Sequence, residues 1–409
     1  MNNIIIFEVN LTGHHGIYLE KIIKTYLKAG DKVTVVISAN YKKNTFFNNF
    51  ITNDLFSIKA CDYEYSFLSK LLHLFLPNVA REFNFWSKFQ KEYNKLNLAK
   101  DIDFVFLPYA DYCLYAIAFL GSPFQKSLWS GICMRPSFHL PFYETNVPNS
   151  FIKILKEKLF RYLLRTSQLK CLFTIDPLLF DFVKNNPRYN KSRKLFFLSD
   201  PADKSIFIDI NKTKRQYGFK KASKIILVYG FIDKRKGLFD LLDTLRINRS
   251  LTDWHVLIVG NQSEEVKKEL LIEKWNSLMK EKRIFEVSKF VNAKIEQEVF
   301  EIANVIWIAY ESHEQMSGVL VRAGMHSKPV LAYNYGLIGW YVKHFNLGLC
   351  SKSKKVGDIS KALKMLKTKN NRQRLGLNGF NLFAANTWSN FEKTLIFTRE
   401  RAYEISKNI

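Results

Sequence analysis

The sequence lacks the cysteine patterns that a zinc site or a disulfide framework requires. Its 409 residues include five cysteines, an odd number with wide spacing and no C-x-x-C pair: Cys61, Cys113, Cys133, Cys171 and Cys350. Such cysteine usage is typical of a reducing compartment and argues against structural zinc. We therefore expect a cytoplasmic protein that holds no metal ion.

Long uninterrupted hydrophobic runs are also missing. The longest apolar segment, residues 104–124, is interrupted by Pro108, by Asp111 and by the turn at residues 121–123. It therefore falls short of the roughly 20 apolar residues that cross a bilayer as a helix. The N-terminal apolar stretch follows no basic residues and stops at Glu8, which is too short for a signal peptide. We expect neither a transmembrane helix nor a signal peptide.

Acidic residues are few relative to basic ones. The chain has 62 Lys and Arg against 37 Asp and Glu, a net charge of +25, on a background that is 47% apolar and 15% aromatic. This composition excludes a disordered or collagen-like chain. The positive charge suits nucleic acid, an anionic membrane surface or phosphorylated small molecules. Because the sequence has neither zinc-finger spacing nor an RNA-recognition aromatic signature, we do not expect nucleic acid as the partner.

Alternating apolar patterns predict strands and helices along the whole chain. In the first half a β-rich run at residues 4–9, an amphipathic segment at 18–29 and an apolar run at 33–37 form a βαβ unit, and three more strand-like runs follow at 104–107, 128–133 and 169–175. In the second half the strand-like runs fall at 225–229, 256–259, 284–287, 305–308 and 330–332. This alternation predicts an α/β protein with two doubly wound, Rossmann-like parallel-sheet domains facing a cleft.

Breaks in these patterns give the expected domain limits. Residues 199–203 and the basic, poorly periodic residues 212–224 have the character of a linker. We expect a first domain over residues 1–204 and a second domain over residues 205–388. Residues 389–409 form one more amphipathic helical pattern, which we expect to cross back onto the first domain.

The first unusual turn is Gly13-His14-His15-Gly16, between the first strand and the first helix. Glycines at this point allow close approach of a phosphate or sugar, and the helix N-terminus offers unpaired N–H groups. The dinucleotide-binding G-x-G-x-x-G pattern is absent. The alternative is a tight turn capped by polar residues.

The second unusual turn follows the first strand of the second domain and reads Gly230-Phe231-Ile232-Asp233-Lys234-Arg235-Lys236-Gly237. Three consecutive cations before a helix N-terminus make a site for an anion such as a diphosphate. The turn is not a P-loop, because the required order of residues is absent. The alternative is a solvated basic turn.

The third unusual turn, residues 310–318, contains Glu311, His313, Glu314, Ser317 and Gly318 after a very apolar strand. Packing alone does not explain so many polar side chains at this point. Ser317 is also a plausible N-cap of the next helix, so part of the pattern is structural.

These three turns, in this order and spacing, resemble those of GT-B glycosyltransferases of the large retaining group that uses nucleotide-sugar donors, the family 4-like enzymes of bacterial surface polysaccharide synthesis. Further matching pieces are residues 30–35, 257–260 and 328–330. The resemblance implies transfer of a sugar from a nucleoside diphosphate sugar to a glycan or lipid-linked acceptor in O-antigen, capsule or lipopolysaccharide synthesis. It also implies retention of configuration, no metal and no cofactor besides the donor.

The resemblance also assigns roles to residues. The phosphate-binding lysine falls on Lys236, and because Phe231 stands where the family commonly has arginine, Lys234 or Arg235 would supply the missing charge. The first of the family's two glutamates falls on Glu314 and would contact the donor sugar. The second, which would hold the ribose, falls on Arg322.

The remaining site residues follow from the same resemblance and from chain position. Gly230, Ser317 and Gly318 would place backbone groups beside the phosphates, and Gly13 would border the diphosphate and the acceptor. Glu314, His14 and His139 are the candidate catalytic residues. Arg135 and His139 follow the strand at 128–133, where either would bind acceptor or sugar.

Two segments suggest contact with an anionic inner-membrane surface. Residues 151–165 carry apolar residues at helical spacing with Lys and Arg between them, which is typical of an interfacial helix. The Leu-rich residues 67–75 are the second candidate. The alternative for both is a helix packed on the core.

Two other functions stay open at this point. A non-catalytic scaffold of the same fold would account for Phe231 and Arg322. A basic nucleic-acid-binding protein would account for the net charge of +25.

Overall fold

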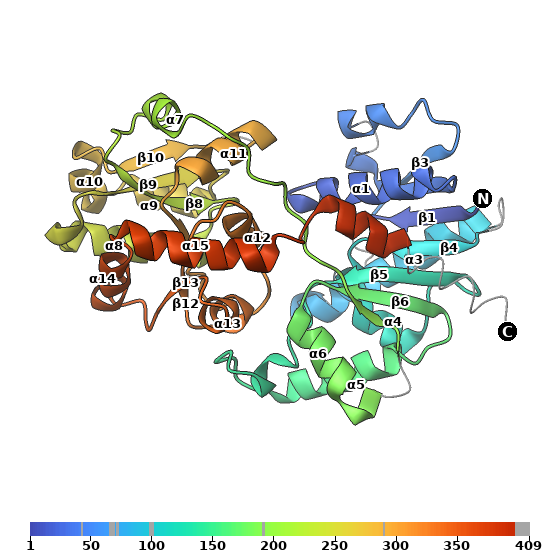
Figure 1. Cartoon of the computed structure of the whole chain (residues 1–409). Coiled ribbons are helices and arrows are strands. Elements are labelled where there is room, and N and C mark those ends of the chain that lie inside the picture. The colour runs from blue at the N-terminus through green and yellow to red at the C-terminus, as the bar shows by residue number, and fades with distance from the viewer. Residues whose placement is uncertain are drawn as a thin grey trace. The chain divides into compact units, whose positions relative to one another are not determined.

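The computed structural model describes residues 1–41, 44–64, 70, 73–97, 102–189, 193–288 and 291–396, apart from the side chain of His14. The chain forms two compact units, seen in Figure 1. The first unit combines residues 1–139 and 149–199 with the C-terminal segment from Trp388, and the second combines residues 140–148 and 200–387. No helix among the described residues is long and apolar enough to span a membrane.

The described part of the first unit contains a seven-stranded sheet in the order β3-β2-β1-β4-β5-β6-β7. All neighbouring strands pair in parallel. The strands are β1 (Asn3–Phe7), β2 (Lys32–Ser38), β3 (Phe56–Cys61), β4 (Phe104–Leu107), β5 (Leu128–Cys133), β6 (Leu169–Thr174) and β7 (Leu195–Phe197). The strand order reverses between β1 and β4, which is where doubly wound sheets bind ligands.

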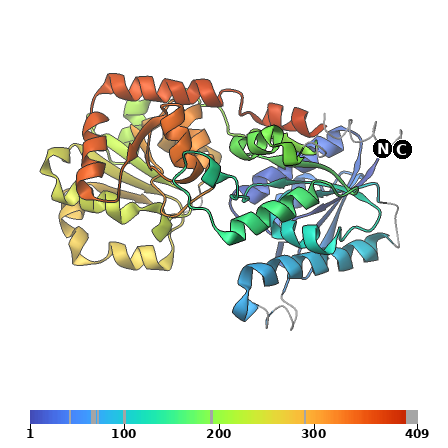
Figure 2. The same cartoon turned by 90° about the horizontal axis from the view of Figure 1, so that it is seen from below.

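Helices cover both faces of this sheet (Figure 2). They are α1 (His14–Lys28), α3 (Pro77–Asn97), α4 (Leu114–Leu120), α5 (Phe151–Leu163) and α6 (Pro177–Asn185). Because side chains alternate along a strand, Val105 and Leu107 pack in the core beneath α3 and α4. Phe104 and Phe106 pack in the core on the opposite face. Each buried strand is therefore apolar on both sides.

The C-terminal segment completes the second of these cores. Residues 388–396 are helical. Phe391 and Leu395 are buried, and the Phe391 ring packs edge-on against Tyr18 of α1 with 5.2 Å between ring centroids. The sequence predicts that residues 389–409 pack on the first domain, and the described part of this segment does so. Residues after 396 lie outside the described residues.

The described part of the second unit contains a six-stranded parallel sheet in the order β10-β9-β8-β11-β12-β13. The strands are β8 (Lys224–Tyr229), β9 (Trp254–Val259), β10 (Ile284–Val287), β11 (Val305–Trp307), β12 (Val330–Tyr333) and β13 (Gly348–Ser351). The helices are α7 (Ile210–Gln216), α8 (Leu238–Ile247), α9 (Glu264–Leu270), α10 (Asn276–Lys280), α11 (Ala293–Ile302), α12 (Gly318–Met325), α13 (Gly336–His344), α14 (Val356–Met365) and α15 (Lys369–Phe383). Helices α8 and α14 share one buried core with this sheet.

The predicted fold class, two doubly wound parallel-sheet domains, is confirmed. The sequence analysis missed β3, β7 and β13, which are edge strands with partly exposed side chains and therefore carry a weaker apolar signal. The linker expected at residues 212–224 is wrong. This stretch contains most of α7, which packs against α11, and leads into β8.

Residues 140–148 correct the expected extent of the first domain, because they belong to the second unit. The backbone oxygen of Thr145 accepts a hydrogen bond from Gly336 N (2.8 Å), and Asn146 Nδ2 donates to the backbone oxygen of Asn334 (2.8 Å). These bonds fix the segment at the start of α13. Local sequence patterns carry no information about such a pairing.

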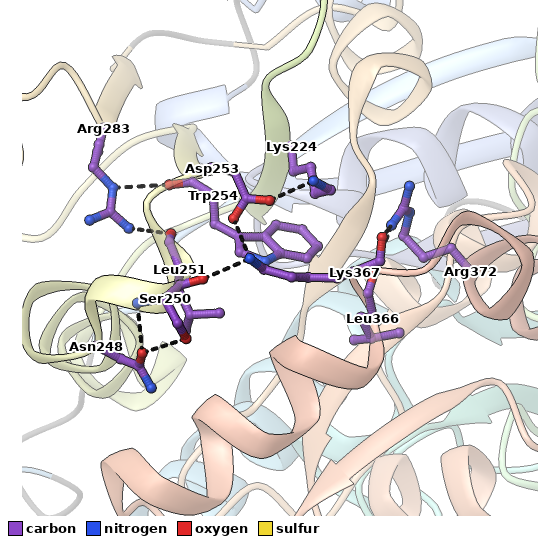
Figure 3. Close-up of polar contacts among 10 residues, drawn as sticks. All are labelled: Lys224, Asn248, Ser250, Leu251, Asp253, Trp254, Arg283, Leu366, Lys367 and Arg372. Carbon is purple, nitrogen blue, oxygen red and sulfur yellow. Dashed lines mark hydrogen bonds and ion pairs between the residues drawn. The ribbon is translucent and has the colours of Figure 1, made fainter.

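A buried arginine joins the ends of the elements around the start of β9 (Figure 3). Arg283 is 4% exposed, and its guanidinium donates to the backbone oxygens of Trp254 (3.1 Å), Leu245 (3.1 Å) and Leu251 (2.7 Å). Nearby, Lys367 donates to Ser250 O (2.7 Å) and pairs with Asp253 (3.0 Å). This network satisfies backbone oxygens that would otherwise be buried without donors.

We expect replacement of Arg283 by methionine to destabilise the second unit by about 3 kcal/mol, because buried carbonyl groups lose their donors. The control is Arg246→Met, which removes only a partly exposed ion pair with Asp243 and should cost about 0.5 kcal/mol. Urea unfolding of both variants measures the difference. Equal midpoints for the two variants would show that the network contributes nothing.

Candidate functional site

The second unit brings two of the three unusual turns together. The strand order reverses between β8 and β11, and ligands of doubly wound sheets bind at the carboxyl ends of the strands at such a point. Residues 230–237 follow β8, and residues 308–318 follow β11. The basic turn and the polar turn therefore share one edge of one sheet.

Lys236 is the buried cation of this edge, 6% exposed. Its Nζ donates to the backbone oxygen of Tyr229 (3.2 Å) and to Tyr310 Oη (2.6 Å), and it lies 4.0 Å from the centroid of the Tyr310 ring. An ammonium group has three donors, and no third acceptor lies within reach among the described residues. Nor does any described carboxylate form an ion pair with it. A buried cation without a counter-ion is costly and favours binding of an anion.

Two glycines near Lys236 adopt positive φ angles. Gly230 has φ +100°, and a Cβ there would lie 3.8 Å from Lys236 Nζ. Gly237 has φ +62°, and a Cβ there would lie 2.5 Å from the backbone oxygen of Ala309. Any larger residue at position 237 would push the start of α8 away from the end of β11.

The other cations of the basic turn have different surroundings. Arg235 Nη1 donates to His313 Nδ1 (2.8 Å), and its guanidinium lies 5.8 Å from the Tyr310 ring. Lys234 is mostly exposed and pairs with Glu265 (3.4 Å). Phe231 is 59% exposed and adds no charge. Arg235 therefore lies closer than Lys234 to the group around Tyr310.

His313 links Arg235 to the polar turn. Burial, and then the positive charge of Arg235, lowers the pKa of His313 to about 4. The ring is therefore neutral near pH 7, with Nδ1 accepting from Arg235 and Nε2 donating to the backbone oxygen of Met316 (3.3 Å). The sequence analysis noted this histidine but gave it no role.

Ser317 and Gly318 begin α12 at the same edge. The Ser317 hydroxyl accepts a hydrogen bond from Val319 N (3.3 Å), which makes Ser317 the N-cap. A Cβ at position 318 would lie 2.9 Å from Arg322 Nη1. Glycine therefore leaves room for the Arg322 side chain along the first turn of the helix.

Arg322 forms an ion pair with a residue that the sequence analysis missed. Its Nε donates to Glu296 Oε1 of α11 (2.9 Å), and the hydroxyl of Tyr229 donates to Glu296 Oε2. Burial opposes the charged form of Arg322, but the carboxylate of Glu296 outweighs it, so the pKa of Arg322 is raised. No local signal marks Glu296, because it is one of several acidic residues along α11.

Glu314 lies beside the start of α13. Tyr335 Oη donates to its carboxylate (3.4 Å), and its backbone oxygen accepts from Leu337 N (2.9 Å). Gly336 has φ +64°, and a Cβ there would lie 2.4 Å from the backbone oxygen of His313. The turn that carries Glu314 is thus held tightly against α13.

The first unit places Gly13 and its neighbours at the carboxyl end of β1. Gly13 has φ +61° and precedes α1, whose first residue is His14. The side chain of His14 lies outside the described ones. His15 is the histidine with described contacts: its Nδ1 lies 3.1 Å from Glu8 Oε1, and its ring stacks on Tyr109 with 3.9 Å between centroids. Glu8 is fully buried, although the sequence analysis used it only as the end of an apolar run.

The structure gives His139 a structural position. Its side chain is fully buried, and its Nε2 lies 2.9 Å from Asp176 Oδ2. The other oxygen of Asp176 caps α6 by accepting from Leu178 N and Leu179 N. The described contacts of this ring therefore support the cap of α6, and the catalytic role of His139 stays a prediction. Nearby, Arg135 N donates to Asp111 Oδ1 (3.1 Å).

Among the described residues, no group of three or more His, Cys, Asp or Glu side chains could hold a metal ion.

The candidate site of the second unit contains cations and the N-terminus of α12, which together suit an anion.

The comparisons with known proteins agree with this picture. Residues 209–381 match the family model described as glycosyl transferases group 1. No curated protein sequence matches the chain significantly. Among solved structures, sucrose-phosphate synthase from Thermosynechococcus elongatus has a TM-score of 0.69 at 13% identity, over 99% of this chain and 100% of that chain.

Two further structures are similar over nearly their whole length. HepE from Anabaena, in complex with UDP and glucose, has a TM-score of 0.65 at 12% identity, over 98% of this chain and 100% of that chain. WaaG, described as a glycosyltransferase involved in lipopolysaccharide biosynthesis, has a TM-score of 0.61 at 13% identity, over 96% of this chain and 98% of that chain. At such low identity the similarity establishes the fold, which is GT-B.

The depressed pKa of His313 predicts a pH dependence of stability. The unfolded chain binds a proton at this histidine near pH 6.5, whereas the folded chain binds it only near pH 4. The unfolded state thus holds more protons in that window, so the contribution of His313 to stability is complete above pH 6.5 and is lost as the pH falls towards 4. An NMR titration of the ring checks this pKa, with His313→Gln identifying the resonance. A wild-type value near 6.5 would contradict it.

Proposed function

Because residues 209–381 match the family model described as glycosyl transferases group 1 and the chain has the GT-B fold, we propose that this protein transfers a sugar from a nucleoside diphosphate sugar to a glycan or lipid-linked acceptor. The observation that carries the proposal is Lys236, a cation 6% exposed that has no counter-ion among the described residues. A diphosphate supplies the missing negative charge. HepE, whose structure contains UDP and glucose, has the same fold.

Lys236 acts on the leaving group in this proposal. As the bond between the sugar and the diphosphate breaks, negative charge develops on the diphosphate oxygen. A fixed ammonium and the N-terminus of α12 stabilise that charge without rearrangement, which lowers the barrier. Arg235 adds a second positive charge near the same edge, where its guanidinium contacts His313.

Glu314 orients the donor sugar, because hydroxyl groups donate well to a carboxylate. The turn that carries it is fixed by the bond from Leu337 N to its backbone oxygen and by the close approach of Gly336. The acceptor binds at the switch point of the first sheet, beside Gly13, His14 and the stacked rings of His15 and Tyr109.

Three finer parts of the proposal rest on the resemblance of the sequence to the retaining family 4-like enzymes. The transfer retains the configuration of the sugar, needs no metal ion, and belongs to surface polysaccharide synthesis. The similarity to WaaG, a protein involved in lipopolysaccharide biosynthesis, supports this setting. The site of action is the cytoplasmic side of the inner membrane.

The test of the donor site is thermal stabilisation by UDP, GDP, ADP, CDP and dTDP, because a ligand that binds only the native state raises the melting temperature. We expect one of them to stabilise the wild type and Lys236→Met to bind it about a hundredfold more weakly, since a charge-assisted contact is lost.

Lys234→Met is the matched control. Lys234 lies two residues before Lys236 in the same basic turn, but it is mostly exposed and pairs with Glu265. It should weaken binding by about twofold or less. Equal losses in the two variants would show that general positive charge, and not the Lys236 site, binds the nucleotide. Stabilisation by none of the five nucleotides would favour the non-catalytic scaffold.

A membrane surface is the second part of the proposed setting. Helices α3, α4 and α5 lie next to one another on one face of the first sheet. The N-terminal half of α5 exposes apolar side chains with lysines between them, and α4 and the start of α3 expose more. This basic apolar face consists of Val79, Phe83, Phe119, Leu120, Phe151, Ile152, Lys153, Ile154, Leu155 and Lys156.

Such a face fits an anionic lipid surface, because apolar side chains enter the interface while lysines meet the headgroups. Phe151 is 80% exposed and Ile152 is 64% exposed. The candidate segment at residues 67–75 falls mainly outside the described residues, although Leu74 and Phe75 are exposed.

We expect the double variant Phe151→Ser/Leu155→Ser to bind vesicles of phosphatidylcholine and phosphatidylglycerol about tenfold more weakly than the wild type. The matched control is Phe207→Ser/Leu271→Ser, which removes two exposed apolar side chains from the second unit. Sedimentation with the vesicles measures binding. Equal binding by the two double variants would place the contact elsewhere.

A further inference from the structure

The ion pair between Arg322 and Glu296 lies next to the diphosphate site. Tyr229, the last residue of β8, connects the two: its backbone oxygen accepts from Lys236 Nζ (3.2 Å), and its hydroxyl donates to Glu296 Oε2. Arg322 lies on the first turns of α12, where its Nη1 approaches Gly318. A cation and a carboxylate thus flank one residue at the carboxyl end of β8.

The carboxylate of Glu296 has unused capacity to accept hydrogen bonds. Oε1 accepts from Arg322 Nε (2.9 Å), and Oε2 accepts from the Tyr229 hydroxyl. A carboxylate offers about four acceptor positions, and the described residues fill two of them. The side chain is 16% exposed, so it is not sealed from solvent.

A nucleoside diphosphate has a complementary arrangement of groups. Its diphosphate needs positive charge, which Lys236 supplies, and the adjacent ribose carries two neighbouring hydroxyl groups that need acceptors. We propose that Glu296 binds the ribose hydroxyls of the donor, an inference that rests on the proposed function. Arg322 is then the positioning residue that holds the carboxylate of Glu296. The basic residue at position 322 then does not remove the ribose site but brings a carboxylate to it from α11.

Pairing with Arg322 and Tyr229 orders the side chain of Glu296 before a ligand binds. An unpaired glutamate could adopt several rotamers, and a ligand would have to restrict them at a cost in affinity. Arg322 and Tyr229 hold the carboxylate from two directions before the ligand arrives. The ion pair also balances the charge of Arg322, which a partly buried guanidinium requires.

The experiment compares UDP, GDP, ADP, CDP and dTDP, each with its 2′,3′-dideoxy analogue, by calorimetric titration of the full chain. For the nucleotide that binds, we expect the wild type to prefer the ribose form about tenfold, since hydrogen bonds to a charged acceptor are lost in the analogue. Glu296→Gln, which keeps a hydrogen bond to Arg322, should reduce the preference to about threefold or less.

Glu298→Gln is the matched control. Glu298 lies on the same helix and also accepts from a tyrosine hydroxyl, that of Tyr217 (2.8 Å), but this pair joins α11 to α7 and not to the diphosphate site. The control should keep the tenfold preference. Binding of inorganic pyrophosphate should be unchanged in both variants, which excludes a general loss of the fold.

The role of Arg322 has its own variants. Arg322→Met should lose the preference as Glu296→Gln does, because the carboxylate of Glu296 then lacks its guanidinium partner. The double variant Glu296→Leu/Arg322→Met removes both members of the pair and should show no preference. An Arg322→Met protein with the full preference would overturn the positioning role.

The outcomes separate this inference from the proposed function. If a nucleotide binds and requires Lys236 but the wild type does not distinguish ribose from dideoxyribose, the inference is wrong and the donor site stands. The inference is also wrong if Glu296→Gln keeps the full preference. If UDP, GDP, ADP, CDP and dTDP all fail to bind the wild type, the donor site and this inference fail together.

Discussion

The buried ammonium of Lys236 is the constraint on which the candidate site depends. Its two described acceptors, Tyr229 O and Tyr310 Oη, come from the ends of the neighbouring strands β8 and β11. Neither acceptor carries a full negative charge, so the cation is held in place without being neutralised. Taking a charge out of water is costly unless something pairs with it. In the proposed function a nucleoside diphosphate supplies the missing negative charge.

Close backbone approaches bring the two turns around this cation together. Gly237 lets the start of α8 lie against Ala309 at the end of β11, and Gly336 lets α13 lie against His313. These close approaches bring the basic turn and the polar turn within hydrogen-bond distance, as the contact from Arg235 to His313 shows. The low pKa of His313 is a consequence, because burial and the neighbouring guanidinium both oppose its protonation. Beside Tyr310 the positive charge is thus carried by Lys236 and Arg235.

The first unit uses the same sheet topology for a different set of side chains. At the switch point of its sheet the fully buried Glu8 holds His15, and the imidazole stacks on Tyr109. Stacked aromatic rings and the hydrogen-bonded pair of Glu8 and His15 suit a sugar better than a diphosphate, since sugars bind through hydroxyl groups and apolar ring faces. This contrast between the two units supports separate donor and acceptor roles for them.

The sequence by itself determined the two doubly wound sheets, because the apolar pattern of a strand buried on both faces is local. It also determined the basic turn with Lys236, since consecutive cations before a helix start are visible without any tertiary contact. The sequence did not predict edge strands such as β13, because a short, partly exposed strand lacks a continuous apolar pattern. Only the tertiary structure decided the surroundings of His139 and Glu296. His139 is enclosed with Asp176, 37 residues away, and Glu296 is paired with Arg322, 26 residues away. Burial and ion pairing depend on which elements pack together, and packing brings together residues whose distance along the chain carries no signal.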